Sequence, residues 1–108
     1  MAINIFTNIR RNLYDNVYNC IVKDKVNVNE RDEDTGNPPL IVAVLENNKE
    51  IVELLLNHGS DINLMDWTSK NTALDIAEQK GFLSIVEILQ KRGAKYGSGS
   101  SFHLAAKN

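Results

Sequence analysis

The feature that most constrains the fold is an internal repeat, because the sequence matches itself when it is shifted by 34 residues. The shift pairs Leu40 with Leu74, Ala43 with Ala77, Ile51 with Ile85, Val52 with Val86, Leu55 with Leu89 and Gly59 with Gly93. A shift in the other direction adds a weaker third copy, in which Phe6 matches Leu40, Ile9 matches Ala43, Val17 matches Ile51 and Asn29 matches Asn63. A fixed period of this length is typical of repeat architectures, in which each unit packs on its neighbours.

Each unit has the pattern of two short helices. Pro39 suits the first position of a helix, and Leu40, Ala43 and Val44 then share one face. Asn47 and Asn48 end this helix, and a second apolar stripe runs to Gly59. The pattern predicts helices near residues 3–11, 14–24, 39–46, 50–57, 73–80, 84–91 and 101–107. Two such helices cannot bury their stripes alone, so stacked units are expected.

The segments between the units are polar and about ten residues long, too short for another core element. Period and helix pattern alone also allow another helical-hairpin repeat, such as the tetratricopeptide type. That type lacks the glycine followed by a polar hairpin after its second helix, which favours a different repeat family here.

The two best-defined units resemble ankyrin repeats. The segments "GNPPLIVAVLENNKEIVELLLNHGSDIN" and "NTALDIAEQKGFLSIVEILQKRGAK" carry the family's helix opening, its second helix and the glycine that ends it. The resemblance implies an all-α fold, an ankyrin-repeat solenoid of stacked antiparallel helix pairs joined by β-hairpin-like loops. It divides one domain, 1–108, into an N-terminal capping repeat (1–29), two repeats (30–63 and 64–96) and a partial C-terminal repeat or cap (97–108).

Several positions depart from the family pattern. Pro38 and Ile41 replace the usual threonine and histidine of the first opening, so the side-chain cap is expected to be absent there. In the second opening Thr72 and Asp75 keep the spacing of a capping box. Lys70 replaces the usual glycine of the second hairpin, which predicts a turn of non-standard shape. The Gly-Ser run at 97–100 is native chain or an artificial linker, and the chain that follows is an improvised cap or the start of a further repeat.

Composition and motifs argue against several kinds of function. The formal net charge of −2 counts against nucleic acid as the main partner, and the longest apolar run, residues 40–45, is too short to span a bilayer. Cys20, His58 and His103 are scattered, so no metal site is expected, and neither a phosphate-binding loop nor a nucleophile motif is present. We therefore expect no enzyme activity and no cofactor. We expect Cys20 to be a small buried apolar residue, and its being the single cysteine fits a reducing, cytoplasmic compartment.

The ankyrin resemblance implies a protein-binding module that uses its hairpin tips and the exposed side of its first helices. The residues that this mapping selects are Arg31, Glu33, Asp34, Leu45, Glu46, Leu64, Met65, Trp67, Ser69, Lys70, Gln79 and Lys80. The sole tryptophan, Trp67, lies in a polar segment and belongs to neither helix stripe. It is either an exposed binding anchor or a residue that folds back over the neighbouring hairpin, and the sequence leaves both readings open.

The leading hypothesis is a small adaptor or effector that binds a protein partner, acting in the cytoplasm of its own cell or of a host cell. One alternative is a terminal fragment or regulatory module of a larger ankyrin-containing protein. A second is a self-associating structural unit. We expect a monomer, with a weak homodimer through the C-terminal end as the alternative.

Overall fold

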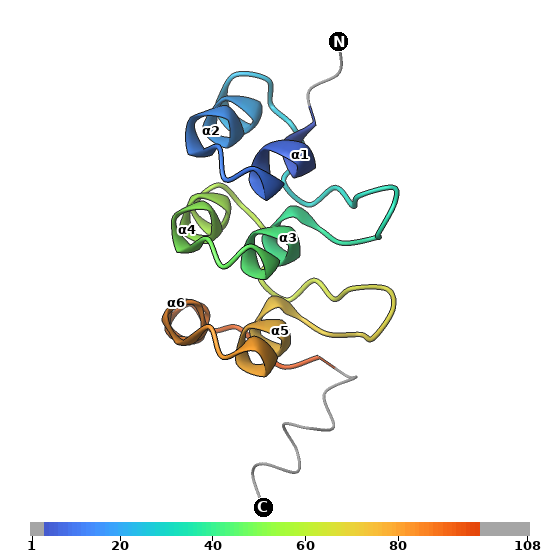
Figure 1. Ribbon diagram of the computed structural model, residues 1–108, viewed down its shortest axis with the longest axis vertical. Helices are drawn as coiled ribbons and strands as arrows, with labels where there is room; N and C mark the ends of the chain where they lie inside the picture. Colours follow the sequence, from blue (N-terminus) through green and yellow to red (C-terminus); the bar gives the residue numbers. More distant parts are fainter. Residues whose placement is uncertain (1–3, 98–108) are drawn as a thin grey trace, which may run out of the picture.

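The computed structural model describes residues 4–97, and these form three helix–turn–helix pairs stacked in a row (Figure 1). The pairs are α1 (Ile5–Arg10) with α2 (Tyr14–Val22), α3 (Pro39–Leu45) with α4 (Lys49–Asn57), and α5 (Ala73–Lys80) with α6 (Leu83–Lys91). The described residues contain no strand, so the prediction of an all-α stack of helix pairs is confirmed, and the helix bounds agree within two residues. The helix expected at 101–107 lies outside the described residues.

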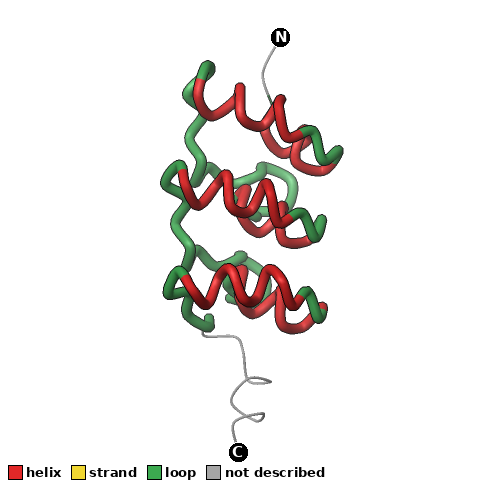
Figure 2. The backbone as a smooth tube through the Cα atoms, turned by 90° about the vertical axis from the view of Figure 1, so that its left-hand side faces the viewer, coloured by secondary structure: helices red, strands yellow, loops and turns green. Residues whose placement is uncertain are grey.

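The three pairs form two parallel stacks of helices. The first helices contact one another in the order α1, α3, α5, and the second helices in the order α2, α4, α6 (Figure 2). The middle helix α3 is covered on both sides, so every residue from 39 to 44 is buried. In the second stack Val17, Leu55 and Leu89 are fully buried. This arrangement explains why apolar stripes too narrow for an isolated helix pair form one continuous core.

The turns inside the pairs form where asparagine and glycine were expected to end the first helices. Asn47 has φ 54°, and Asn48 caps α4 by accepting a hydrogen bond from the Ile51 N–H at 3.0 Å. Gly81 takes the same left-handed conformation, with φ 73°, after α5. Pro38 provides no side-chain cap, whereas the Thr72 and Asp75 side chains form a complete capping box at the start of α5. Both capping predictions are confirmed.

The first pair departs from the 34-residue register inside its turn. The Asn12 N–H donates to the Ile9 carbonyl at 2.9 Å, and the equivalent bond in the second pair joins Asn47 to Val44 at 2.8 Å. Ile9 therefore occupies the place of Val44, and the predicted match of Ile9 with Ala43 is wrong by one residue. The reason is that α1 is one residue shorter than α3, so the turn comes one position earlier in its unit.

Asparagine side chains connect each unit to the next. The Asn29 side-chain oxygen accepts a hydrogen bond from the Asp61 N–H at 2.7 Å, and its amide group donates to the Gly59 carbonyl at 3.2 Å. One unit further on, the Asn63 side chain accepts from the Lys95 N–H at 2.8 Å. These bonds set the distance between successive connecting segments, and hence the spacing of the loops that project from the stack.

Candidate protein-binding surface

Two loops project from the same side of the stack, one before α3 and one before α5 (Figure 1). We call them the first hairpin (residues 30–37) and the second hairpin (residues 64–71). The backbone N–H of Asp32 donates to the Asn37 carbonyl at 3.0 Å, and the N–H of Asp66 donates to the Asn71 carbonyl at 2.8 Å. Each loop is thus closed across its base in the same way, which matches the predicted hairpin-like connections.

Lys70 does not give the second hairpin a non-standard turn, so that prediction is wrong. Lys70 takes φ 57°, in the left-handed region that Gly36 occupies in the first hairpin with φ 76°. The Asp66 side chain compensates by accepting hydrogen bonds from the N–H groups of Ser69, at 2.8 Å, and Asn71, at 3.3 Å. These bonds hold the turn in a conformation that a lysine adopts at some cost.

All the residues expected in the binding surface reach solvent, to different extents. Those classed as exposed are Glu33, Asp34, Leu45, Glu46, Trp67, Ser69, Lys70, Gln79 and Lys80, whereas Arg31, Leu64 and Met65 are half-buried. Leu45 and Lys80 are the last residues of α3 and α5, about 10 Å along each helix from the hairpin that precedes it. The structure therefore separates the helix residues of the predicted site from the hairpin residues.

The first hairpin is acidic at its surface and has one carboxylate turned inwards. Asp32 is buried and pairs with Arg10 of α1 at 2.5 Å, and its other oxygen accepts from the Asp34 N–H at 3.0 Å. These hydrogen bonds, with that of Arg10 the largest influence, hold the pKa of the Asp32 carboxyl below its usual value. No sequence spacing indicated this pair, because Arg10 and Asp32 meet only through the stacking of α1 on the hairpin.

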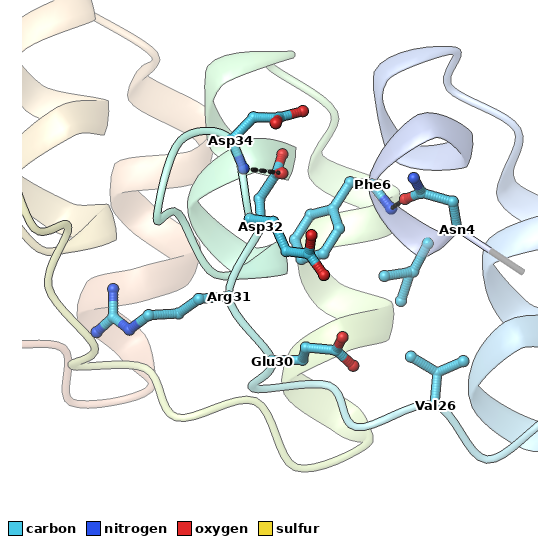
Figure 3. Close-up of a pocket in the computed structure, with 9 residues that line it drawn as sticks. Asn4, Phe6, Val26, Glu30, Arg31, Asp32 and Asp34 are labelled. Carbon is cyan, nitrogen blue, oxygen red and sulfur yellow. Dashed lines mark hydrogen bonds between the residues drawn. The ribbon is translucent and has the colours of Figure 1, made fainter. Parts of the chain in front are cut away.

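A recess of about 320 Å³ lies between the start of α1 and the first hairpin (Figure 3). Its apolar wall comes from Ile5, Phe6 and Val26, and its rim carries Glu30, Glu33 and Asp34. Arg31 points away from the recess, towards the second hairpin. The rim therefore has negative charge that this arginine does not neutralise.

Trp67 combines the two roles that the sequence left open. Its ring lies against Gly36 of the first hairpin, because a Cβ atom built on Gly36 would come within 2.5 Å of the indole Cε3. The Arg31 guanidinium lies 5.1 Å from the ring centroid, and the same group donates to the Gly36 carbonyl at 2.7 Å. Even so, 62% of the tryptophan surface remains exposed. The ring is thus packed locally against the first hairpin and open to solvent over most of its surface.

No metal site appears among residues 4–97, where His, Cys, Asp and Glu side chains form no group of three or more that could hold an ion. Over the same residues, none of the helices has the length and apolar character required to cross a membrane. Cys20 is buried on α2, as expected, and burial is the main cause that raises the pKa of its thiol. His58 lies at the end of α4, edge-on to the Tyr18 ring at 6.2 Å.

Comparison with known proteins assigns the family. The model of "Ankyrin repeats (3 copies)" matches residues 7–99. The chain belongs to the ankyrin repeat family. This ankyrin repeat chain is 38% identical over 86 residues to ankyrin repeat protein FPV031 of Fowlpox virus, covering 79% of this chain and 25% of that protein. It is 32% identical over 95 residues to human ankyrin repeat and SOCS box protein 6, covering 82% of this chain and 23% of the relative.

The solved structures agree with this assignment. The crystal structure of the ankyrin repeat domain of Bcl-3 superimposes with a TM-score of 0.78 at 28% identity, covering 84% of this chain and 39% of that one. The chain spans about a quarter of the length of the curated relatives quoted above. Ankyrin repeats form a protein–protein interaction scaffold.

Proposed function

We propose that this ankyrin repeat chain is a non-enzymatic adaptor that binds a protein partner through its two hairpins, with the exposed ends of α3 and α5 as a secondary contact. The observation that carries the proposal is Trp67, which is 62% exposed although its ring is held by the first hairpin. An aromatic side chain that is already positioned loses little conformational freedom on binding. Tryptophan and arginine are also enriched among the residues that dominate binding energy.

A capture experiment tests this function. The wild-type chain, Trp67→Ala and Leu83→Ala are immobilised, and the proteins retained from a lysate are quantified by mass spectrometry. Leu83 is a matched control because it is an apolar residue, 76% exposed, on α6 and away from both hairpins. We expect a set of proteins retained by the wild type and by Leu83→Ala but lost with Trp67→Ala. Equal retention by all three would contradict a hairpin-centred binding surface, provided that their circular dichroism spectra agree.

One further candidate is a regulatory module within a larger protein. It is favoured by the relatives, of which this chain matches only about a quarter. The proposed single domain of 1–108, with its capping repeat, two repeats and partial last repeat, serves either role. The proposed location is the cytoplasm, in line with a single cysteine that is buried. The third candidate, a self-associating unit, predicts a concentration-dependent mass in analytical ultracentrifugation.

A further inference from the structure

Trp67 of the second hairpin contacts two residues of the first hairpin. Gly36 lies against its ring, and the Arg31 guanidinium lies 5.1 Å from the ring centroid. Gly36 lies against the six-membered part of the indole, and Arg31 joins the arrangement through its hydrogen bond to the Gly36 carbonyl. Because 62% of its surface remains exposed despite these contacts, much of the ring is available to a ligand.

The open face of an indole attracts cations, and arginine and lysine are the usual partners. Arg31 already meets this preference from the side of the first hairpin. The exposed part of the electron-rich ring is left for a group supplied by another molecule. A planar guanidinium suits this position well, since it stacks on aromatic rings and is less strongly hydrated than an ammonium group.

The charges around Trp67 favour the same kind of group. The two hairpins carry five carboxylates against two cations, Arg31 and Lys70. Asp32 is neutralised by Arg10, and Asp66 is bound to backbone N–H groups of its own turn. The remaining carboxylates, Glu30, Glu33 and Asp34, are exposed and have no ion pair within residues 4–97. The summed formal charge of the two hairpins is therefore negative, although Arg31 lies against the ring.

The repeat places Trp67 and the carboxylates of the first hairpin at equivalent positions of neighbouring units. Glu33 occupies the same position in the first hairpin as Trp67 in the second, one period of 34 residues later. Stacked helices lie about 8–10 Å apart, so equivalent positions of neighbouring hairpins have a similar separation. An extended chain covers that distance in about three residues. One peptide can thus reach Trp67 and the carboxylates of the first hairpin together.

We propose that the surface formed by Trp67, Glu33 and Asp34 binds a basic segment of the partner protein, with one arginine or lysine side chain stacked on the open face of Trp67 and a second cation beside Glu33 and Asp34. This inference rests on the proposed protein-binding function and names the chemistry of the partner. Lysine and arginine differ in the strength of stacking, and arginine is expected to bind more tightly.

The test uses three capped peptides and the full chain. The first contains two arginines three positions apart in a glycine background, the second has citrulline in their place, and the third has glutamate. Citrulline keeps the planar shape of the side chain and removes its charge. Binding is followed by the fluorescence of Trp67 and by the backbone amide chemical shifts of Asp34, Trp67 and Ser69. We expect the arginine peptide to shift all three amides and to bind more weakly as salt is added, with the citrulline and glutamate peptides far weaker.

Variants assign the binding to the proposed surface. Trp67→Leu keeps an apolar side chain and removes the aromatic ring. Its affinity for the arginine peptide, followed by the amide shifts of Asp34 and Ser69 alone, should fall about two- to fivefold. Glu33→Gln with Asp34→Asn should weaken it about two- to tenfold. The matched control is Glu53→Gln with Glu87→Gln, which makes the same change of net charge at exposed positions of α4 and α6 and should leave affinity unchanged.

The inference is overturned if the citrulline or glutamate peptide binds as well as the arginine peptide, if none of the three binds, or if the control pair weakens binding as much as the hairpin pair. None of these results decides the proposed function. Capture of a partner that still depends on Trp67 would keep the protein-binding role and remove only the basic character of the partner.

Discussion

Replacement of Gly36 by alanine is expected to damage the domain through Trp67 of the other hairpin. Gly36 has φ 76°, and an added Cβ would lie 2.5 Å from Cε3 and 2.9 Å from Cδ2 of the indole. Non-bonded carbon atoms do not approach this closely, so the indole ring or the first hairpin must shift and their contact is weakened. The substitution therefore combines backbone strain in its own hairpin with loss of a contact between hairpins.

The magnitude follows from the covered part of the tryptophan. With 62% of the side chain exposed, 38% is covered. For an aromatic residue of roughly 250 Å², this is on the order of 100 Å². At about 25 cal/mol per Å² the contact contributes at most about 2 kcal/mol, because the unfolded chain also covers part of this area. Left-handed strain on a non-glycine residue adds about 1–2 kcal/mol. Gly36→Ala should thus lower the free energy of unfolding by about 1–4 kcal/mol.

Gly81→Ala separates the two contributions. Gly81 has φ 73°, close to that of Gly36, but a Cβ added there meets nothing within 4 Å. It should therefore show only the strain, about 1–2 kcal/mol. A double-mutant cycle gives the same separation, since Gly36→Ala in a Trp67→Ala background should cost about as much as Gly81→Ala. Urea unfolding of each variant, followed by helical circular dichroism because Trp67 is absent in two of them, measures all these values.

Two results would refute this reasoning. Gly36→Ala no more costly than Gly81→Ala would mean that Trp67 does not lie on the first hairpin. Additive effects of Gly36→Ala and Trp67→Ala would have the same meaning, because residues in contact are expected to show a coupling energy.

Three other predictions follow from single contacts. Since Trp67 is 62% exposed, its emission should lie near the red limit of a solvated indole and be quenched by iodide; blue emission that iodide does not quench would remove it from the binding surface. Leu55→Ala and Leu89→Ala should each lower the free energy of unfolding by about 2–5 kcal/mol, because both side chains are fully buried, and an unchanged melting temperature for either would contradict the stacked core. The folded-state pKa of Asp32 is depressed by Arg10, so its contribution to stability is complete above the unfolded pKa near 4 and is lost as pH falls through the lower folded pKa. Arg10→Gln should therefore lower the free energy of unfolding at neutral pH and make it decrease less steeply as the pH falls into the acid range. An equally steep decrease for wild type and variant would show that the Arg10–Asp32 ion pair does not stabilise the fold.

The periodic pattern by itself determined the architecture. Apolar residues at helical spacing, repeated every 34 positions and punctuated by Asn47, Asn48, Gly59 and Gly81, permit only stacked helix pairs, and the described helices follow that pattern. The capping box of Thr72 and Asp75 was also readable, because its two members are three residues apart and act within one turn. A capping box depends only on residues that are close together in the sequence, so the sequence alone is enough to predict it.

The one-residue shift in the first helix pair could not be predicted from the sequence in the same way. An offset of 34 residues fits both ends of that unit, and only the packed turn after Ile9 shows that α1 ends early. The shape of the second hairpin was missed for a related reason. Lysine disfavours a left-handed turn as an isolated residue, but the Asp66 side chain holds the turn closed through two backbone bonds.

Sequence and tertiary structure each determined a different part of the proposed binding surface. Residue type and the repeat predicted which side chains stand on the hairpins, and Trp67 was selected because it fits neither helix stripe. Only the tertiary structure placed Arg31 and Gly36 of one hairpin against Trp67 of the next, turned Asp32 towards Arg10, and left Glu33 and Asp34 in solvent. These contacts join residues 22 to 36 positions apart, and they exist because stacking brings successive units within about 10 Å of one another. Sequence pattern specifies each unit, and the distance between stacked units decides which side chains meet and which remain free to bind.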